Sequence, residues 1–195
     1  MKGLVKTSLV IVVMFTTMLS FANEFTILTK EKTKEITNVT FENVKSGSLL
    51  VIKDHYGMIL FKELIENTGD YSKGFDLTAL PDGNYYFELD KEVEIKIRPF
   101  MVTSNVVTFD KSKEYTINKP FVTSRGNRIL VSKLALTNQP LDIKIYDENH
   151  HLIFSDKLEN GQILERIYNM SKVTKGKYKF ILKSDGREFI EQIEI

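Results

Sequence analysis

The chain has 195 residues, of which 42% are hydrophobic and 27% charged, and this composition is ordinary for a globular protein rather than a disordered one. Its 27 basic and 26 acidic residues nearly cancel, so the charge balance argues against a nucleic-acid or anionic-lipid partner. The sequence contains no cysteine, which excludes disulfides, cysteine nucleophiles, thiolate metal sites and a cysteine-linked bacterial lipid anchor.

The N-terminal residues have the pattern of a secretory signal peptide. Lys2 and Lys6 precede an apolar stretch at residues 9–19, and small residues follow at positions 20 and 22. This order predicts cleavage after Ala22. The apolar stretch is shorter than the ~20 residues of a membrane-spanning helix, so we expect a removed leader and not an anchor. No second stretch of that length follows. The mature chain is therefore expected to have no membrane span and to be periplasmic, cell-surface or secreted.

The remaining sequence contains an internal repeat, in which Asp54 aligns with Asp147, 93 residues later. Matched aromatic residues, a matched glycine and a matched acidic turn residue in one uninterrupted register indicate a duplicated unit. We place the first unit at residues 23–112 and the second at residues 113–195. The matched pairs include Ile52 with Ile145, Phe61 with Phe154, Phe75 with Tyr168, Gly83 with Gly176, Tyr85 with Tyr178, and Phe87 with Phe180.

Apolar residues alternate with polar ones along short segments of both units. Tyr85, Phe87 and Leu89 alternate with residues of the opposite phase, which is typical of a strand with one face on a core. No amphipathic helix of useful length interrupts these segments. The sequence therefore predicts an all-β protein with two tandem immunoglobulin-like antiparallel β-sandwich domains. We expect Val106, Val107 and Phe109 to form the last strand of the first unit, and Tyr115, Ile117 and Phe121 to open the second.

Two kinds of turn recur in the units. Asp54 and Asp147 each begin a tight turn, where the carboxylate can bond the backbone two residues later. Gly83 and Gly176 each precede a strand, and we expect both to have a positive φ.

Residues 80–87, with the sequence LPDGNYYF, resemble the strand entry of type IX secretion sorting domains. Those domains are immunoglobulin-like β-sandwiches at protein C-termini, and residues 141–147 and 176–180 fit the same pattern. Over most of its mature length the chain resembles small exported flavobacterial (Bacteroidota) proteins with two such units. The resemblance implies a sandwich fold and leaves open whether the second unit is a secretion-sorting element. It is weaker in the second copy, where Val173 to Gly176 replace the proline motif, and at the C-terminus, which lacks a basic end.

Three histidines, His55, His150 and His151, fall in the two aspartate turns. They could belong to metal or proton-transfer sites. The histidine and aspartate of one turn, however, cannot by themselves supply the three or four converging ligands of a metal site. We therefore interpret them as solvated turn residues and predict no metal and no cofactor. We expect the side chain of Tyr86 to be exposed, because it lies on the outward phase of its strand. Its counterpart in the second copy is Lys179.

No nucleophile elbow, phosphate-binding glycine loop or paired-carboxylate pattern is evident in the sequence. We therefore predict a noncatalytic exported protein that has a structural role or binds a protein or glycan of unknown identity. Tyr86 and the three histidines are its candidate surface contacts. The alternatives are a type IX-like sorting function for the second unit and, less favoured, an unrecognised hydrolase.

Overall fold

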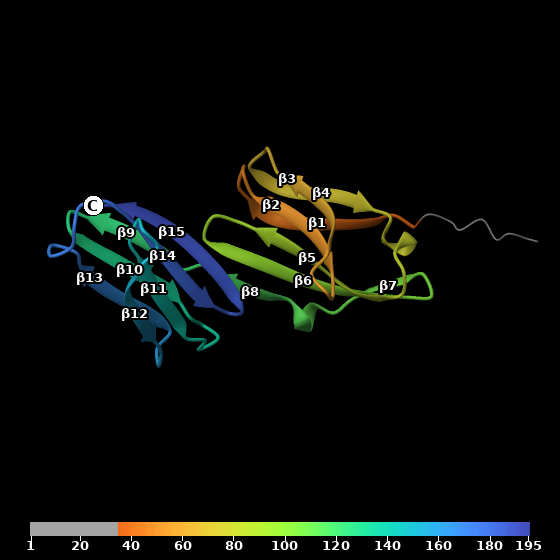
Figure 1. Ribbon diagram of the computed structural model, residues 1–195. Helices are drawn as coiled ribbons and strands as arrows, with labels where there is room; N and C mark the ends of the chain where they lie inside the picture. Colours follow the sequence, from red (N-terminus) through yellow and green to blue (C-terminus); the bar gives the residue numbers. More distant parts are fainter. Residues whose placement is uncertain (1–34) are drawn as a thin grey trace, which may run out of the picture. The chain divides into compact units, whose positions relative to one another are not determined.

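The computed structural model describes residues 35–195, and Figure 1 shows their strands. The predicted signal peptide and its cleavage after Ala22 lie outside the described residues. Apart from two short 3-10 helices, η1 (Leu77–Ala79) and η2 (Lys111–Lys113), every regular element described is a β-strand. All the described strand pairs are antiparallel, so the predicted all-β fold is confirmed. None of the described helices is long and apolar enough to cross a membrane.

The first copy of the repeat consists of a two-stranded sheet packed on a six-stranded one. The small sheet pairs β1 (Thr37–Val44) with β4 (Gly69–Phe75). The large sheet has the order β3-β2-β5-β6-β7, and β8 also pairs with β6. Its strands are β2 (Leu49–Asp54), β3 (Ile59–Leu64), β5 (Gly83–Asp90), β6 (Glu94–Thr103), β7 (Val106–Phe109) and β8 (Tyr115–Asn118).

The second copy repeats this topology. Its four-stranded sheet has the order β12-β11-β14-β15, which matches β3-β2-β5-β6 strand for strand. Its other sheet, β13-β10-β9, contains the counterparts of β4 and β1 together with a third strand. The strands are β9 (Phe121–Arg125), β10 (Arg128–Leu134), β11 (Leu141–Tyr146), β12 (Leu152–Leu158), β13 (Ile163–Asn169), β14 (Lys177–Ser184) and β15 (Arg187–Glu194).

The segment between the copies differs from the sequence-based expectation. Tyr115 and Ile117 lie in β8, which pairs with β6 of the first copy, and only Phe121 begins a strand of the second. Ile117 is buried with Ile95 and Ile97 of β6, and this apolar contact gives β8 a reason to stay with the first copy. The boundary between residues 112 and 113 stays a prediction.

Each core contains the same aromatic column between its two sheets. In the first copy, the ring of Phe75 lies edge-on to Phe61 at 5.2 Å and to Phe87 at 5.3 Å, measured between ring centroids. Such edge-to-face contacts add to the burial of the rings themselves. The counterparts at the repeat offset form a similar column in the second copy: Phe154, Tyr168 and Phe180, with separations of 5.4 and 6.4 Å, although Phe154 is 46% exposed.

A second repeated feature explains the motif at residues 80–85. The Tyr85 hydroxyl donates a hydrogen bond to the Pro81 carbonyl oxygen at 2.8 Å, and Tyr178 donates likewise to Thr174. A tyrosine that bonds the backbone a few residues upstream is the tyrosine corner of immunoglobulin-like sandwiches. The matched tyrosines therefore fix the chain where it enters β5 and β14.

The expected positive φ at the two glycines is wrong for Gly83. This residue is the first of β5 and pairs with Val102, so its backbone is that of a strand. The expectation is confirmed for Gly176, which has a positive φ of 158° and exchanges two backbone hydrogen bonds with Ile195. Its lack of a side chain matters for space, since a Cβ there would lie 3.3 Å from Oε2 of Glu148.

Glu92 and its repeat counterpart Asp185 each pair with a lysine, but the lysines come from different positions and the two pairs differ in burial. Lys45 Nζ lies 3.1 Å from Oε2 of Glu92, and both side chains are 71% exposed. In the second copy, Lys133 Nζ lies 2.7 Å from Oδ2 of Asp185, and the lysine is only 1% exposed. Lys133 is on the inward face of β10, so its ammonium group depends on this carboxylate for compensation.

Removing the carboxylate should therefore matter far more in the second copy. We expect Asp185→Asn to lower the free energy of unfolding by about 3 kcal/mol, because it leaves a buried ammonium group without its counter-charge. The matched variant Glu92→Gln should cost less than about 1 kcal/mol, since its pair is exposed to water. Urea denaturation of the two variants checks this; equal losses would contradict the assignment of Lys133 as a buried, paired cation.

Candidate functional site

The two aspartate turns are held by the aspartate side chains. Oδ1 of Asp54 accepts hydrogen bonds from the backbone N–H groups of Tyr56 and Met58, at 3.0 and 2.9 Å. The bond to Tyr56 confirms the prediction that this side chain closes the turn two residues later. Asp147 accepts a hydrogen bond from the backbone N–H of His151 at 2.8 Å, and this bond, ahead of a weaker one from the backbone of Asn149, lowers the pKa of Asp147.

The three candidate histidines lie in these turns and do not form one site. His55, between β2 and β3, is exposed, and its ring contacts that of Tyr56 at a tilt of 41°, with centroids 3.7 Å apart. His150 and His151 lie between β11 and β12, where Nδ1 of His151 is 3.2 Å from Oδ2 of Asp147. Among residues 35–195, no group of three or more histidine or acidic side chains is placed to hold a metal ion. Their role as surface contacts stays a prediction.

His150 occupies the turn position that glycine occupies in the first copy. Its φ is 64°, and that of its counterpart Gly57 is 87°. A side chain is unfavourable in this left-handed conformation, and the space around Gly57 is open, so the difference is one of backbone strain alone.

Reciprocal substitutions measure this strain. We expect His150→Gly to raise the free energy of unfolding by about 1 kcal/mol and Gly57→His to lower it by a similar amount. Thermal and urea denaturation of the two variants are the measurements. A loss of stability in His150→Gly would show that the imidazole makes a contact worth more than the strain.

The outward face of β5 is covered, contrary to the expectation for Tyr86. Tyr86 is half-buried and packs against a cluster formed by Ile95, Ile97 and Ile117. Burial raises the pKa of its hydroxyl, and the negative charge of Glu88 raises it further. Tyr86 is thus not a freely exposed side chain, because neighbouring strands bring apolar residues over it.

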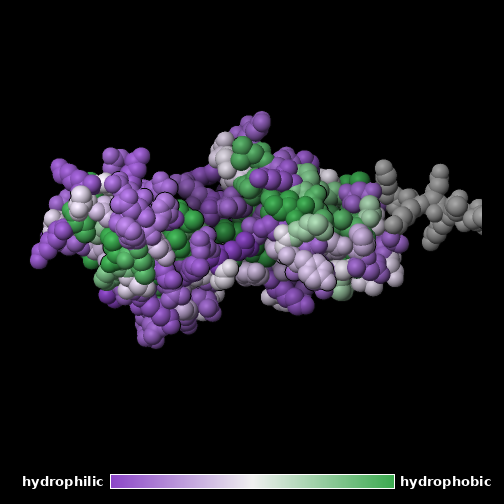
Figure 2. Space-filling model, in the orientation of Figure 1, coloured by the Kyte–Doolittle hydropathy of each residue, from purple (hydrophilic) through white to green (hydrophobic). Residues whose placement is uncertain are grey.

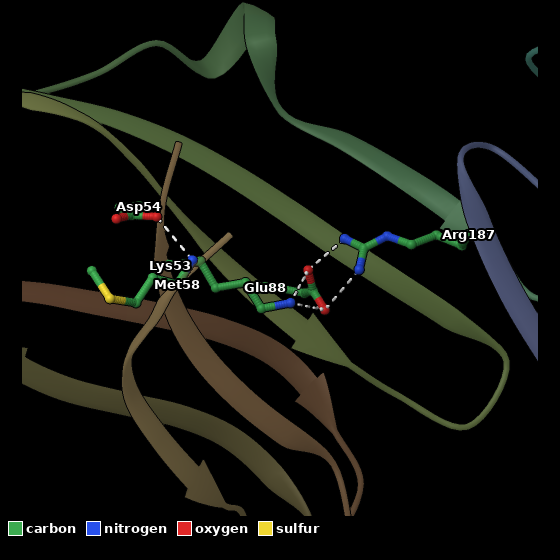
Figure 3. Close-up of polar contacts among 5 residues, drawn as sticks. All are labelled: Lys53, Asp54, Met58, Glu88 and Arg187. Carbon is green, nitrogen blue, oxygen red and sulfur yellow. Dashed lines mark hydrogen bonds and ion pairs between the residues drawn. The ribbon is translucent and has the colours of Figure 1, made fainter. Parts of the chain in front are cut away.

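Glu88 is the centre of a polar cluster on this face, shown in Figure 3. It is 6% exposed. Its carboxylate accepts hydrogen bonds from Lys53 Nζ at 3.1 Å to both oxygens, and from the guanidinium of Arg187 on β15. Figure 3 also shows the neighbouring turn, where Asp54 accepts the hydrogen bond from Met58.

This cluster was missed at the level of sequence. On an alternating strand, Glu88 has the pattern of a solvated charge, as Lys53 does on β2. The one sequence feature that indicated a covered position was the repeat, because the counterpart of Glu88 in the second copy is the apolar residue Ile181. A carboxylate enclosed by two cations is poorly placed to transfer protons to a substrate, so we interpret the cluster as structural.

Neutralising Glu88 should destabilise the protein. We expect Glu88→Gln to lower the free energy of unfolding by about 3 kcal/mol, since two partly buried cations lose their shared counter-charge. Glu188 provides the control because its pair with Lys183 is largely exposed, with side-chain exposures of 43% and 56%. Glu188→Gln should cost less than about 1 kcal/mol in the same denaturation experiment. Similar losses would refute the structural role of Glu88.

Apolar residues, four of them exposed and Leu130 half-buried, gather on the outer face of the sheet β13-β10-β9. We call this set the apolar face: Phe121, Leu130, Leu134, Ile163 and Ile167. Ile163 and Ile167 are 66% and 61% exposed, and Phe121 is 50% exposed. Figure 2 shows, for one side of the molecule, that hydrophobic residues reach the surface among hydrophilic ones.

The corresponding face of the first copy is polar along β1 and β4, and its one exposed aliphatic residue among those described is Ile36, beside Gly74. On β1 and β4 the outward positions include Asn38, Thr40, Ser72 and Gly74, and the hydroxyls of Thr40 and Ser72 lie 3.0 Å apart. Both faces belong to sheets of the same topology. The fold therefore does not require apolar residues there, and the apolar face is a property of the second copy alone.

Comparison with known proteins adds little to this description. No protein-family model matches the chain, and no curated protein matches it. Among solved structures the chain is similar to a "Biofilm associated protein - BSP domain", with 13% sequence identity and a TM-score of 0.30. The match covers 83% of this chain and 27% of that chain, so the chain spans about a quarter of that protein's length. At this TM-score the likeness carries no conclusion about function.

Proposed function

We propose that the chain is an exported, noncatalytic protein that binds another protein through the apolar face of its second copy. The observation that carries the proposal is the contrast between the copies: the same sheet is polar in the first and apolar in the second. Exposed apolar patches of this kind mark interaction surfaces, because keeping them in water is unfavourable. Export is supported by the signal-peptide pattern of residues 1–22.

A protein fits this surface better than a glycan does. Four of its five side chains are aliphatic, and Phe121 is the single aromatic ring among them. A sugar is usually held by aromatic platforms and by polar groups that bond its hydroxyls. A flat aliphatic sheet face is instead the surface that another protein covers by close packing.

Site-specific photo-cross-linking tests the proposal. A photoreactive amino acid placed at Ile167 should give covalent protein adducts in cells that export the protein. The same residue placed at Ser72, on the polar face of the first copy, should give none. Adducts at both positions, or at neither, would contradict protein binding by the apolar face. If the molecule cross-linked at Ile167 were a glycan and not a protein, the result would favour a glycan partner.

A further inference from the structure

Lysines gather at one end of the second copy, in the loop before β14 and along the start of that strand. We call them the lysine cluster: Lys172, Lys175, Lys177 and Lys179. Lys179 is half-buried and the other three are exposed. None of the four belongs to an ion pair between described residues, whereas most other lysines of residues 35–195 do. The cluster is therefore a concentration of uncompensated positive charge.

The fold does not require these lysines. Both copies have the same strand order and the same tyrosine corner in this region. Lysines so close along the chain repel one another, so they oppose folding rather than support it. The contrast with the first copy thus points to a role outside the fold. At the repeat offset, the counterparts of the four lysines are Ala79, Asp82, Asn84 and Tyr86.

Two arginines add positive charge at the same end of the sandwich. Arg125 and Arg128 lie opposite each other where β9 turns into β10, and like charges in that arrangement are unfavourable. The other three described arginines each pair with a carboxylate, but these two have no such ion pair among residues 35–195. Their turn adjoins the loop that carries the lysines, because the carbonyl oxygen of Asn127 accepts a hydrogen bond from the backbone N–H of Met170 at 2.8 Å.

A groove follows the lysine cluster. One hollow of about 310 Å³ lies between the turn after β11 and the loop before β14, and three of the four lysines line it. A second hollow of about 180 Å³ shares Lys177 with the first and continues to Lys179. Asp147 and Glu148 line both hollows, but Asp147 bonds the backbone of its own turn. Four lysines against two carboxylates give this lysine groove an excess of positive charge, which concentrates anions there.

We infer that the lysine groove binds an anionic glycan, a polysaccharide with a carboxylate or phosphate on its repeating unit. An extended polymer places successive negative groups against successive lysines, which one small anion cannot do. Ammonium groups attract carboxylates and phosphates alike as point charges, so the groove selects the charge of the ligand and not its source. The groove is separate from the apolar face, and the inference does not depend on the protein partner proposed for that face.

Single-stranded nucleic acid fits this groove less well than a glycan does. Its bases are usually held by stacking on aromatic side chains. The lining contains no phenylalanine or tryptophan among the described residues, and its tyrosine, Tyr178, is buried with its hydroxyl bonded to the Thr174 carbonyl oxygen. The groove therefore offers charge and polar groups without a platform for bases.

Binding of the purified protein to immobilised polysaccharides tests the inference. It should bind polygalacturonate, which carries carboxylates, or phosphomannan, which carries phosphates, and should not bind uncharged dextran. The double variant Lys175→Glu, Lys177→Glu should weaken this binding about tenfold or more, because two attractions become repulsions. The control double variant Lys62→Glu, Lys111→Glu makes the same change in net charge at exposed positions outside the groove. It should alter binding by less than about twofold, since salt screens distant charges. Circular dichroism melting of each variant excludes unfolding as the cause.

The dependence on salt and on the polymer decides the outcome. Raising the NaCl concentration from about 50 to about 300 mM should weaken binding at least about tenfold, because charge supplies the attraction. Binding to either acidic polysaccharide with these properties supports the inference, and the one preferred identifies carboxylate or phosphate as the source of the charge. Binding to neither, equal binding to dextran, or equal losses in the two double variants overturns it. Tighter binding of single-stranded DNA than of both acidic polysaccharides also overturns it.

Discussion

Both copies depend on one contact, an aromatic column that joins the two sheets of each sandwich. Phe75 in the first copy and Tyr168 in the second stand on one sheet and meet aromatic rings on the other. Because the sequence contains no cysteine, no disulfide links the sheets, and burial between them must supply the cohesion. The tyrosine corners then fix where the strands beside this column begin.

Much of this arrangement could be predicted from the sequence. Alternation of apolar and polar residues identifies the inward positions, and the repeat shows which of them are equivalent. Phe87 and its counterpart Phe180 were thus recognisable as core. The turn aspartates were also predictable, because their chemistry is local and needs only the next few residues.

The outward positions were not predictable in the same way. Whether Tyr86 or Glu88 faces water depends on which other strand covers β5, and alternation contains no information about such coverage. The placement of β8 has the same origin, since its four residues fit either neighbour by pattern alone. The apolar face was missed because only the pairing of β10 with β9 and β13 shows that its residues share one surface.

The buried ion pair between Lys133 and Asp185 has a consequence for folding. Two similar units in one chain can exchange equivalent strands while they fold, and such misassembly is a known hazard of repeat proteins. If β10 replaced β1, the strand register would put Lys133 at the buried position of Phe41, and Asp185 would lose its amine. An unpaired charge left in a core is strongly unfavourable. The buried pair thereby helps each strand to assemble with its own sandwich and not with its neighbour's.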